Sequence, residues 1–256
     1  MKTTTLAALA LSAALLPAGH TEAAWDRGCG LSVEVDGVAR PEYHGRGQVY
    51  VEAVRGKEYV LRVTNPFGVR VAVALAVDGL STIDAGRSDA WTASKWVLGP
   101  YESIEIAGWQ VSGSEARKFY FTGERGSYGA WLGRTEDLGV IEAVFFREKE
   151  REVWRSGRGG MAQDSAAAPQ ARSEASKGAP EPADDYAATG IGDRTHHPVE
   201  RVALDLERTP AAKVRIRYEF RPQLIKLGLL PRHTSLDRRE RARGFEGAWC
   251  PEPPGR

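Results

Sequence analysis

The segment from Val69 to Asp78 alternates between two kinds of residue at every position. One set consists of branched apolar residues, namely Val69, Val71, Val73, Leu75 and Val77. The intervening set consists of Arg70, Ala72, Ala74, Ala76 and Asp78. Because successive side chains of a β-strand point to opposite faces, this pattern predicts a half-buried strand. It favours an antiparallel β protein, and it carries no chemistry of its own.

Several other segments alternate in the same way, with Gly and Pro between them. We predict strands at 31–35, 49–54, 59–64, 95–98, 101–106, 117–122 and 140–146. Asn65-Pro66-Phe67-Gly68 and Asp78-Gly79 are turn signals that bracket the strand at 69–77. Short strands at this spacing predict a mainly β fold, an antiparallel β-sandwich or a jelly-roll-like domain. The expected core comprises Leu61, Val63, Val71, Val73, Leu75, Val77, Ile104, Ile106, Phe119 and Phe121.

The composition changes after the predicted β-sandwich at 25–155. Residues 156–188 are rich in Ala, Pro, Ser and Gly, which predicts a disordered linker or excursion loop. Two amphipathic strands follow, one containing Val202, Leu204 and Leu206 and the other spanning 214–220. A lone hairpin is marginal in water, so we expect this C-terminal β-hairpin, with a short helix at 221–228, to dock on the sandwich as a unit at 189–231.

The first 24 residues predict export. The apolar run from Leu6 to Leu16 follows Lys2 and ends at Pro17. This run is too short to span a bilayer but fits the central region of a secretory signal peptide. We therefore expect a periplasmic or secreted chain that begins at Ala24 or Trp25 and has no transmembrane segment.

The charge balance argues against nucleic acid as a partner. The formal net charge is +1, which gives no global attraction for a polyanion. Positive charge gathers in the basic tail at 232–256, whose segment 232–243 holds five arginines against Asp237 and Glu240. Such a tail fits either a contact with an anionic envelope surface or a solvated terminus.

The two cysteines lie near opposite ends of the mature chain. An oxidising compartment would join Cys29 and Cys250 in a disulfide if the two ends meet. Sequence spacing alone leaves pairing and free thiols equally open.

No catalytic signature is present. The chain lacks a Gly-x-Ser-x-Gly elbow, a His-Glu-x-x-His pair and a phosphate-binding glycine loop. Gly190-Ile-Gly192 is best explained as a turn, and Asp78 as a turn former. His196 and His197 are adjacent, so on an extended chain they point apart and do not form a metal site. We expect no cofactor and no metal.

Aromatic residues are the best candidates for ligand contact. Trp91, Trp131 and Tyr128 lie in or beside loops, where exposed rings could stack on sugars or anchor a protein partner. Trp96 and Trp109 are instead expected to cap the core.

Several short motifs resemble a group of uncharacterised exported bacterial β proteins. The motifs are Tyr59-x-Leu61-x-Val63-x-Asn65, Val77-Asp78-Gly79-Leu80, Val97-Leu98-x-Pro100, Ile106-x-Gly108-Trp109, Phe119-x-Phe121, Gly139-Val140-Ile141, Thr189-Gly190-x-Gly192 and the strand ending in Tyr218. This resemblance implies an envelope or secreted β protein and brings no catalytic residues with it.

The sequence thus predicts an exported, non-enzymatic protein that binds an unknown protein or glycan partner in the cell envelope. Two alternatives stay open. One is a carbohydrate-binding or carbohydrate-active protein that uses the rim aromatics. The other is an adhesion or assembly subunit that offers a sheet edge to its partners.

Overall fold

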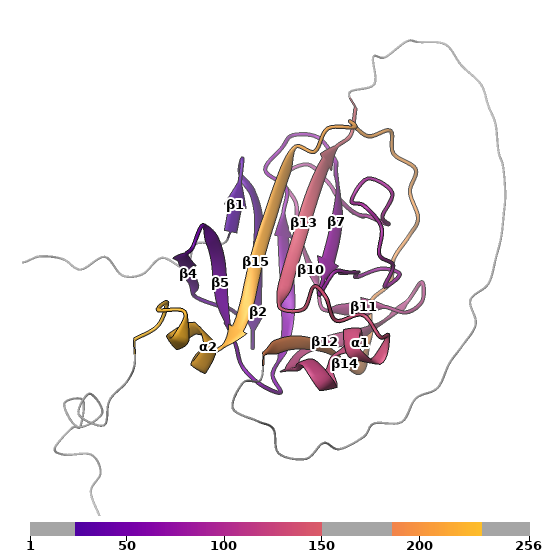
Figure 1. Ribbon diagram of the computed structural model, residues 1–256. Helices are drawn as coiled ribbons and strands as arrows, with labels where there is room; N and C mark the ends of the chain where they lie inside the picture. Colours follow the sequence, from indigo (N-terminus) through magenta and orange to yellow (C-terminus); the bar gives the residue numbers. More distant parts are fainter. Residues whose placement is uncertain (1–23, 150–185, 232–256) are drawn as a thin grey trace, which may run out of the picture.

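The computed structural model describes residues 24–149 and 186–231, and their strands form two sheets packed against each other (Figure 1). Residues 1–23 of the predicted signal peptide, most of the predicted linker and the basic tail lie outside these residues. No helix in the described ranges is long and apolar enough to cross a membrane.

The first sheet has eight strands, all paired antiparallel. They are β1 (Ala24–Asp26), β2 (Cys29–Val35), β3 (Val38–Ala39), β6 (Glu58–Thr64), β10 (Ser103–Ile106), β11 (Gly108–Gln110), β12 (Glu115–Gly123) and β14 (Ala187–His196). The main path runs β1-β2-β6-β12-β11, with β14 paired to β12.

The second sheet has seven strands in the order β4-β5-β15-β13-β7-β8, with β9 paired to β7. They are β4 (Glu42–Gly45), β5 (Gln48–Ala53), β7 (Val71–Val77), β8 (Leu80–Ser81), β9 (Trp96–Leu98), β13 (Val140–Arg147) and β15 (Ala212–Phe220). Strand β15 pairs antiparallel with β13 and parallel with β5, so this sheet is mixed. The helical elements are η1 (Glu124–Gly126), α1 (Tyr128–Trp131) and α2 (Arg221–Lys226).

The mainly β sandwich and its predicted core are confirmed. Nine of the ten predicted core residues are buried, and the tenth, Ile104, is partly buried against the same cluster. Strand β7 differs in one respect, because Ala72 and Ala74 on its second face are buried as well. Ala74 packs in a small cluster with Val144 and Phe146, which Ala90 and Ala93 of the following loop help to cover.

The pairing of the C-terminal strands differs from the predicted hairpin. Strand β14 pairs with β12 in the first sheet, whereas β15 lies between β13 and β5 in the second. Residues 202–206 form no strand, and only Leu206 makes an isolated bridge, to Glu148. Of the two apolar alternations expected to pair, only the second forms a strand, β15, and its partners β13 and β5 come from distant parts of the sequence.

The boundary of the linker and the turn predicted at Gly190–Gly192 are also corrected. Ala187 and Ala188, placed in the linker, are buried at the start of β14, and Gly190 and Gly192 lie within that strand. Small residues there give no strand signal. Tertiary contacts favour small residues here. A Cβ on Gly190 would lie 2.2 Å from Cζ of the Tyr120 ring, so a glycine leaves room for that ring.

The local turn and helix predictions hold. Asp78 and Gly79 both have positive φ, 53° and 71°, as a tight Asp-Gly hairpin turn between β7 and β8 requires. Helix α2 carries Pro222 in its first turn, and Gly228 with φ of 79° follows its end.

Candidate functional site

Two of the three predicted ligand-binding aromatics form a stacked pair. The rings of Tyr128 and Trp131, on helix α1, are nearly parallel at 15° with centroids 5.7 Å apart. Tyr128 also packs on buried Trp109, with centroids 5.0 Å apart. Trp131 is 60% exposed. We call Tyr128 and Trp131 the aromatic platform.

The chain around the platform is held by specific contacts. Ser127 caps α1, because its Oγ accepts a hydrogen bond from the Ala130 amide at 3.0 Å. The carbonyl of buried Gly129 accepts from the Arg134 amide, and a Cβ at Gly129 would lie 2.5 Å from the Arg134 carbonyl oxygen. Beneath the platform, Trp109 Nε1 donates to the Gly190 carbonyl at 3.1 Å. The platform therefore rests on a packed base.

Trp91 belongs to a different surface. Its ring meets Phe146 edge-on at 5.4 Å over the second sheet, and Lys95 Nζ lies 5.8 Å from its centroid. It is 39% exposed. The structure thus brings together Tyr128 and Trp131, while Trp91 serves to cover Phe146. Trp96 and Trp109 are buried, as predicted.

A buried polar cluster joins the two sheets. It consists of Asp78 at the end of β7, Tyr218 of β15, Thr189 of β14 and Tyr59 of β6. Asp78 Oδ1 accepts from Tyr218 Oη at 2.5 Å and from the Gly139 amide at 2.8 Å, and Oδ2 accepts from the Thr189 amide at 2.8 Å. Thr189 Oγ1 lies 2.7 Å from the hydroxyls of both tyrosines. Because the Tyr218 hydroxyl donates to ionised Asp78, its oxygen accepts from Thr189, and Thr189 in turn accepts from Tyr59.

Burial dominates the acid–base properties of this cluster. Desolvation raises the pKa of Asp78 to about 6, against the lowering effect of its hydrogen bonds. Desolvation and the nearby Asp78 charge hold the pKa of both tyrosines well above the usual range. All four residues are buried, so the cluster presents no reactive group to a substrate. Sequence analysis identified Asp78 as a turn former and missed the cluster, in which the hydrogen-bonded pair Asp78 and Tyr218 is 140 positions apart.

Carboxylates also cover part of the outer edge of β14. The Ala187 amide donates to Glu219 Oε2 at 3.3 Å and the Thr189 amide donates to Asp78 Oδ2. Burial raises the pKa of Glu219. These side chains occupy donors that an added strand would need, which disfavours strand addition at this end of β14.

The two adjacent histidines have different surroundings. His197 Nδ1 lies 2.8 Å from Gln110 Oε1, and its ring meets Trp96 edge-on at 5.5 Å. His196 is exposed at the end of β14. Within 24–149 and 186–231, no group of three or more His, Cys, Asp or Glu side chains is placed to hold a metal ion.

Cys29 is fully buried in β2. Desolvation, with a smaller effect of the Asp26 charge, raises the pKa of its thiol to about 11. Its predicted partner Cys250 lies outside the described residues, so the disulfide stays a prediction.

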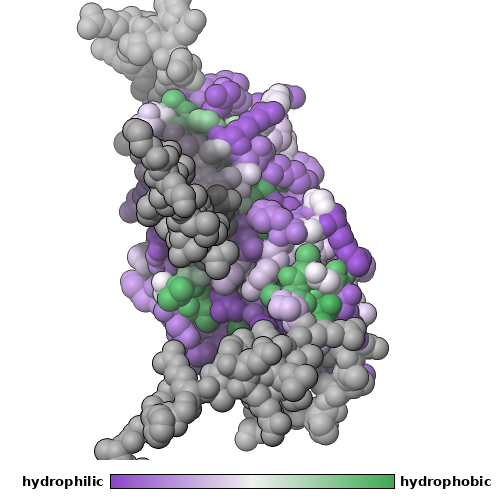
Figure 2. Space-filling model, turned by 90° about the vertical axis from the view of Figure 1, so that its left-hand side faces the viewer, coloured by the Kyte–Doolittle hydropathy of each residue, from purple (hydrophilic) through white to green (hydrophobic). Residues whose placement is uncertain are grey.

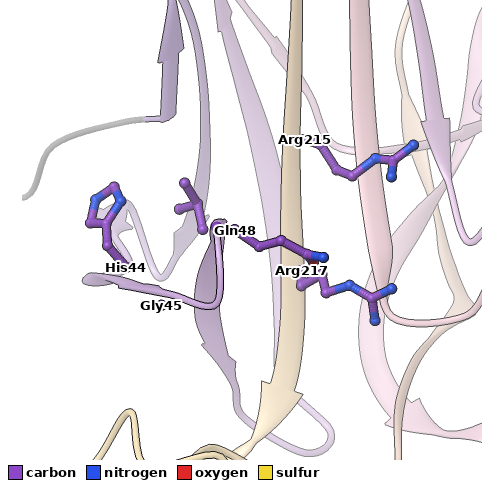
Figure 3. Close-up of a pocket in the computed structure, with 7 residues that line it drawn as sticks. His44, Gly45, Gln48, Arg215 and Arg217 are labelled. Atoms are coloured by element: carbon purple, nitrogen blue, oxygen red, sulfur yellow. The ribbon is translucent and has the colours of Figure 1, made fainter.

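An open basic cleft of about 650 Å³ lies beside the β4–β5 hairpin. Its lining residues are His44, Gly45, Gly47, Gln48, Val49, Arg215 and Arg217. Figure 3 shows His44 on the hairpin, Gln48 extending across β15, and both arginines projecting from β15. The face that carries the hairpin and α2 is largely hydrophilic where it is visible, with separate hydrophobic patches (Figure 2). Sequence analysis missed this cleft, because Arg215 and Arg217 looked like ordinary solvent-facing strand positions.

No family model, curated protein or solved structure matches this chain.

Proposed function

We propose that this protein is an exported, non-enzymatic binding protein of the cell envelope, and that its ligand is a carbohydrate held on the aromatic platform. The observation that carries the proposal is the exposure of Trp131 on a stacked, packed base. Export rests on the signal-peptide pattern of the first 24 residues.

An indole in this position suits a sugar ring. Large exposed aromatic side chains supply flat apolar area at low conformational-entropy cost, because only two χ angles need to be fixed. Here Tyr128 already covers part of the indole and Trp109 packs beneath Tyr128. Little ordering is left for the ligand to impose, and preorganisation of this kind favours affinity.

A glycan array probed with the mature chain and with Trp131→Ala tests the proposal. We expect binding by the wild type and its loss in Trp131→Ala, with partial retention in Trp131→Phe. Trp25→Ala is the matched control, because Trp25 on β1 is 55% exposed, a fraction similar to that of Trp131. Equal thermal unfolding of the variants would show that each is folded.

Either of two results would reject the carbohydrate assignment. One is a folded wild type that binds no glycan, and the other is binding that Trp131→Ala leaves unchanged. The first result would direct attention to a protein partner at the same platform, tested by photo-crosslinking from position 131 in envelope extract. N-terminal sequencing of the mature protein tests export separately, with Ala24 or Trp25 as the expected first residue.

A further inference from the structure

We propose that the basic cleft is a second binding site, which takes an oxyanion group, a phosphate or a carboxylate, on Arg217 and Arg215. This site is independent of the aromatic platform. Its size falls in the range of small-molecule sites, so the oxyanion would be one group of a larger ligand.

The charge of the lining favours an anion. Two of the seven lining residues are arginines, one is a histidine and none is acidic. Two carboxylates interact with these arginines, and both have other partners as well. Glu142 binds Arg215 and Lys213, and Glu219 accepts from the Ala187 amide while it also attracts Arg217. Arg215 is therefore held in place by Glu142, whereas Arg217 has no carboxylate within ion-pair distance in the described part of the chain.

Arg217 carries an unused donor. Its Nε is buried and has no hydrogen-bond partner among the described residues. Leaving a buried donor unpaired is destabilising, so such a group calls for a partner. Nε together with one Nη is the donor pair through which a guanidinium grips a carboxylate or phosphate side-on. Because Nε is buried here, the guanidinium must turn toward the cleft to bind an oxyanion, and this contact would then satisfy the donor and neutralise the charge.

The opposite wall of the cleft is fixed by the fold. Arg46 and Gly47 have φ of 53° and 71°, as the tight turn of the β4–β5 hairpin requires. Gly45 is packed against the segment that follows α2, because a Cβ there would lie 2.3 Å from Leu229 Cδ2. Gln48, on the same hairpin, extends an amide toward the arginines (Figure 3) and could bind the rest of the ligand.

The test follows the side-chain Nε–Hε NMR signals of ¹⁵N-labelled mature protein during titration with inorganic phosphate, glucuronate or glucose. The Arg217 signal is identified by its absence in Arg217→Lys. We expect phosphate or glucuronate to shift it and glucose to leave it in place. A shift with phosphate alone would identify a phosphoryl ligand, and a shift with glucuronate alone would identify an acidic sugar. A shift with both would identify a general oxyanion site.

Calorimetry on variants then separates this site from general attraction. Arg217→Lys keeps the positive charge but loses the paired donors of the guanidinium, and should weaken binding about tenfold or more. Arg194→Lys is the control, because Arg194 is an exposed arginine of β14 that pairs with Glu115. Trp131→Ala should bind phosphate unchanged, which separates this proposal from that for the platform. An unshifted Arg217 signal at about 10 mM anion, or equal affinity in Arg217→Lys, would overturn it.

Discussion

Tyr218 Oη donates a hydrogen bond to Asp78 Oδ1 over 2.5 Å, joining residues 140 positions apart in the sequence. The bond links the centre of the second sheet to its β7–β8 turn. Through Thr189 it continues to Tyr59 in the first sheet. A single buried carboxylate thus organises contacts from four strands that local sequence patterns do not connect.

Tyr218→Phe should destabilise the fold. The variant removes a donor from buried Asp78 and a partner from Thr189, so we expect the free energy of unfolding at pH 7 to fall by about 1–3 kcal/mol. Urea denaturation measures the change. Tyr101→Phe provides the control, because Tyr101 is exposed and its hydroxyl should contribute within about 0.5 kcal/mol. Equal stability of the two variants would show that the buried bond contributes little.

Ionisation of Asp78 should make stability depend on pH. The pKa of its carboxyl in the folded state is about 6, above the ordinary value of 3.8. Between these values the folded state binds more protons than the unfolded state. The contribution of Asp78 to stability is therefore complete below pH 4 and decreases by about 3 kcal/mol as the pH rises to 6, then stays constant. Glu219, whose pKa is also raised, acts in the same direction.

Comparison with Asp78→Asn isolates this effect, since the variant keeps a residue that tolerates positive φ and has no titrating group. The difference in free energy of unfolding between wild type and variant should be largest near pH 4 and should decrease through pH 6. A difference that is constant across this range would show that the carboxyl does not titrate as proposed.

Gly190→Ala tests the close approach of β14 to Tyr120. A Cβ would lie 2.2 Å from Cζ of the Tyr120 ring, so the ring must move from its place over the strand. We expect a loss of about 1–3 kcal/mol in the free energy of unfolding. Gly113→Ala meets no atom within 4 Å and should be neutral or slightly stabilising. Unchanged stability in Gly190→Ala would mean that the ring is free to turn aside.

Burial should protect Cys29 from alkylation. In Cys250→Ser, which removes the only other thiol, iodoacetamide at pH 8 should modify Cys29 only after denaturant is added. The physical reasons are its complete burial and a thiol pKa raised to about 11, since the thiolate is the reactive form. Mass spectrometry reports the modification. Rapid labelling of the native variant would show that β2 opens readily. A mass lower by two hydrogens in the unreduced wild type would reveal the disulfide.

Local patterns predicted the strands that are built from large alternating side chains. Bulky apolar residues recur with the period of a strand in Val71 to Val77 and in Tyr59 to Val63, so both strands can be recognised from the sequence. Strand β14 could not be found in this way, since Ala187, Ala188, Gly190 and Gly192 have little intrinsic strand preference. Its pairing depends on β12 and on the Tyr120 ring, which lie far away in the sequence.

In the candidate sites, too, some features follow from the local sequence and others depend on tertiary contacts. The exposure of Trp131 was predictable from its polar and glycine-rich surroundings, but its stacking on Tyr128 and the separation from Trp91 were not. The basic cleft depends on the parallel pairing of β15 with β5, which sets Arg215 and Arg217 beside the hairpin. No local pattern specifies that pairing.

The sequence by itself determined that this is a sandwich-forming β protein, where most of its strands and turns begin, and which side chains fill the core. Those features follow from the period of apolar residues and from the conformations that Gly, Pro and Asp allow. The tertiary structure alone decided which strands are neighbours, and so placed Asp78 beside Tyr218 and Arg217 beside the hairpin. Such contacts arise because two sheets must bury their apolar faces together, and that requirement brings distant polar groups within hydrogen-bonding distance.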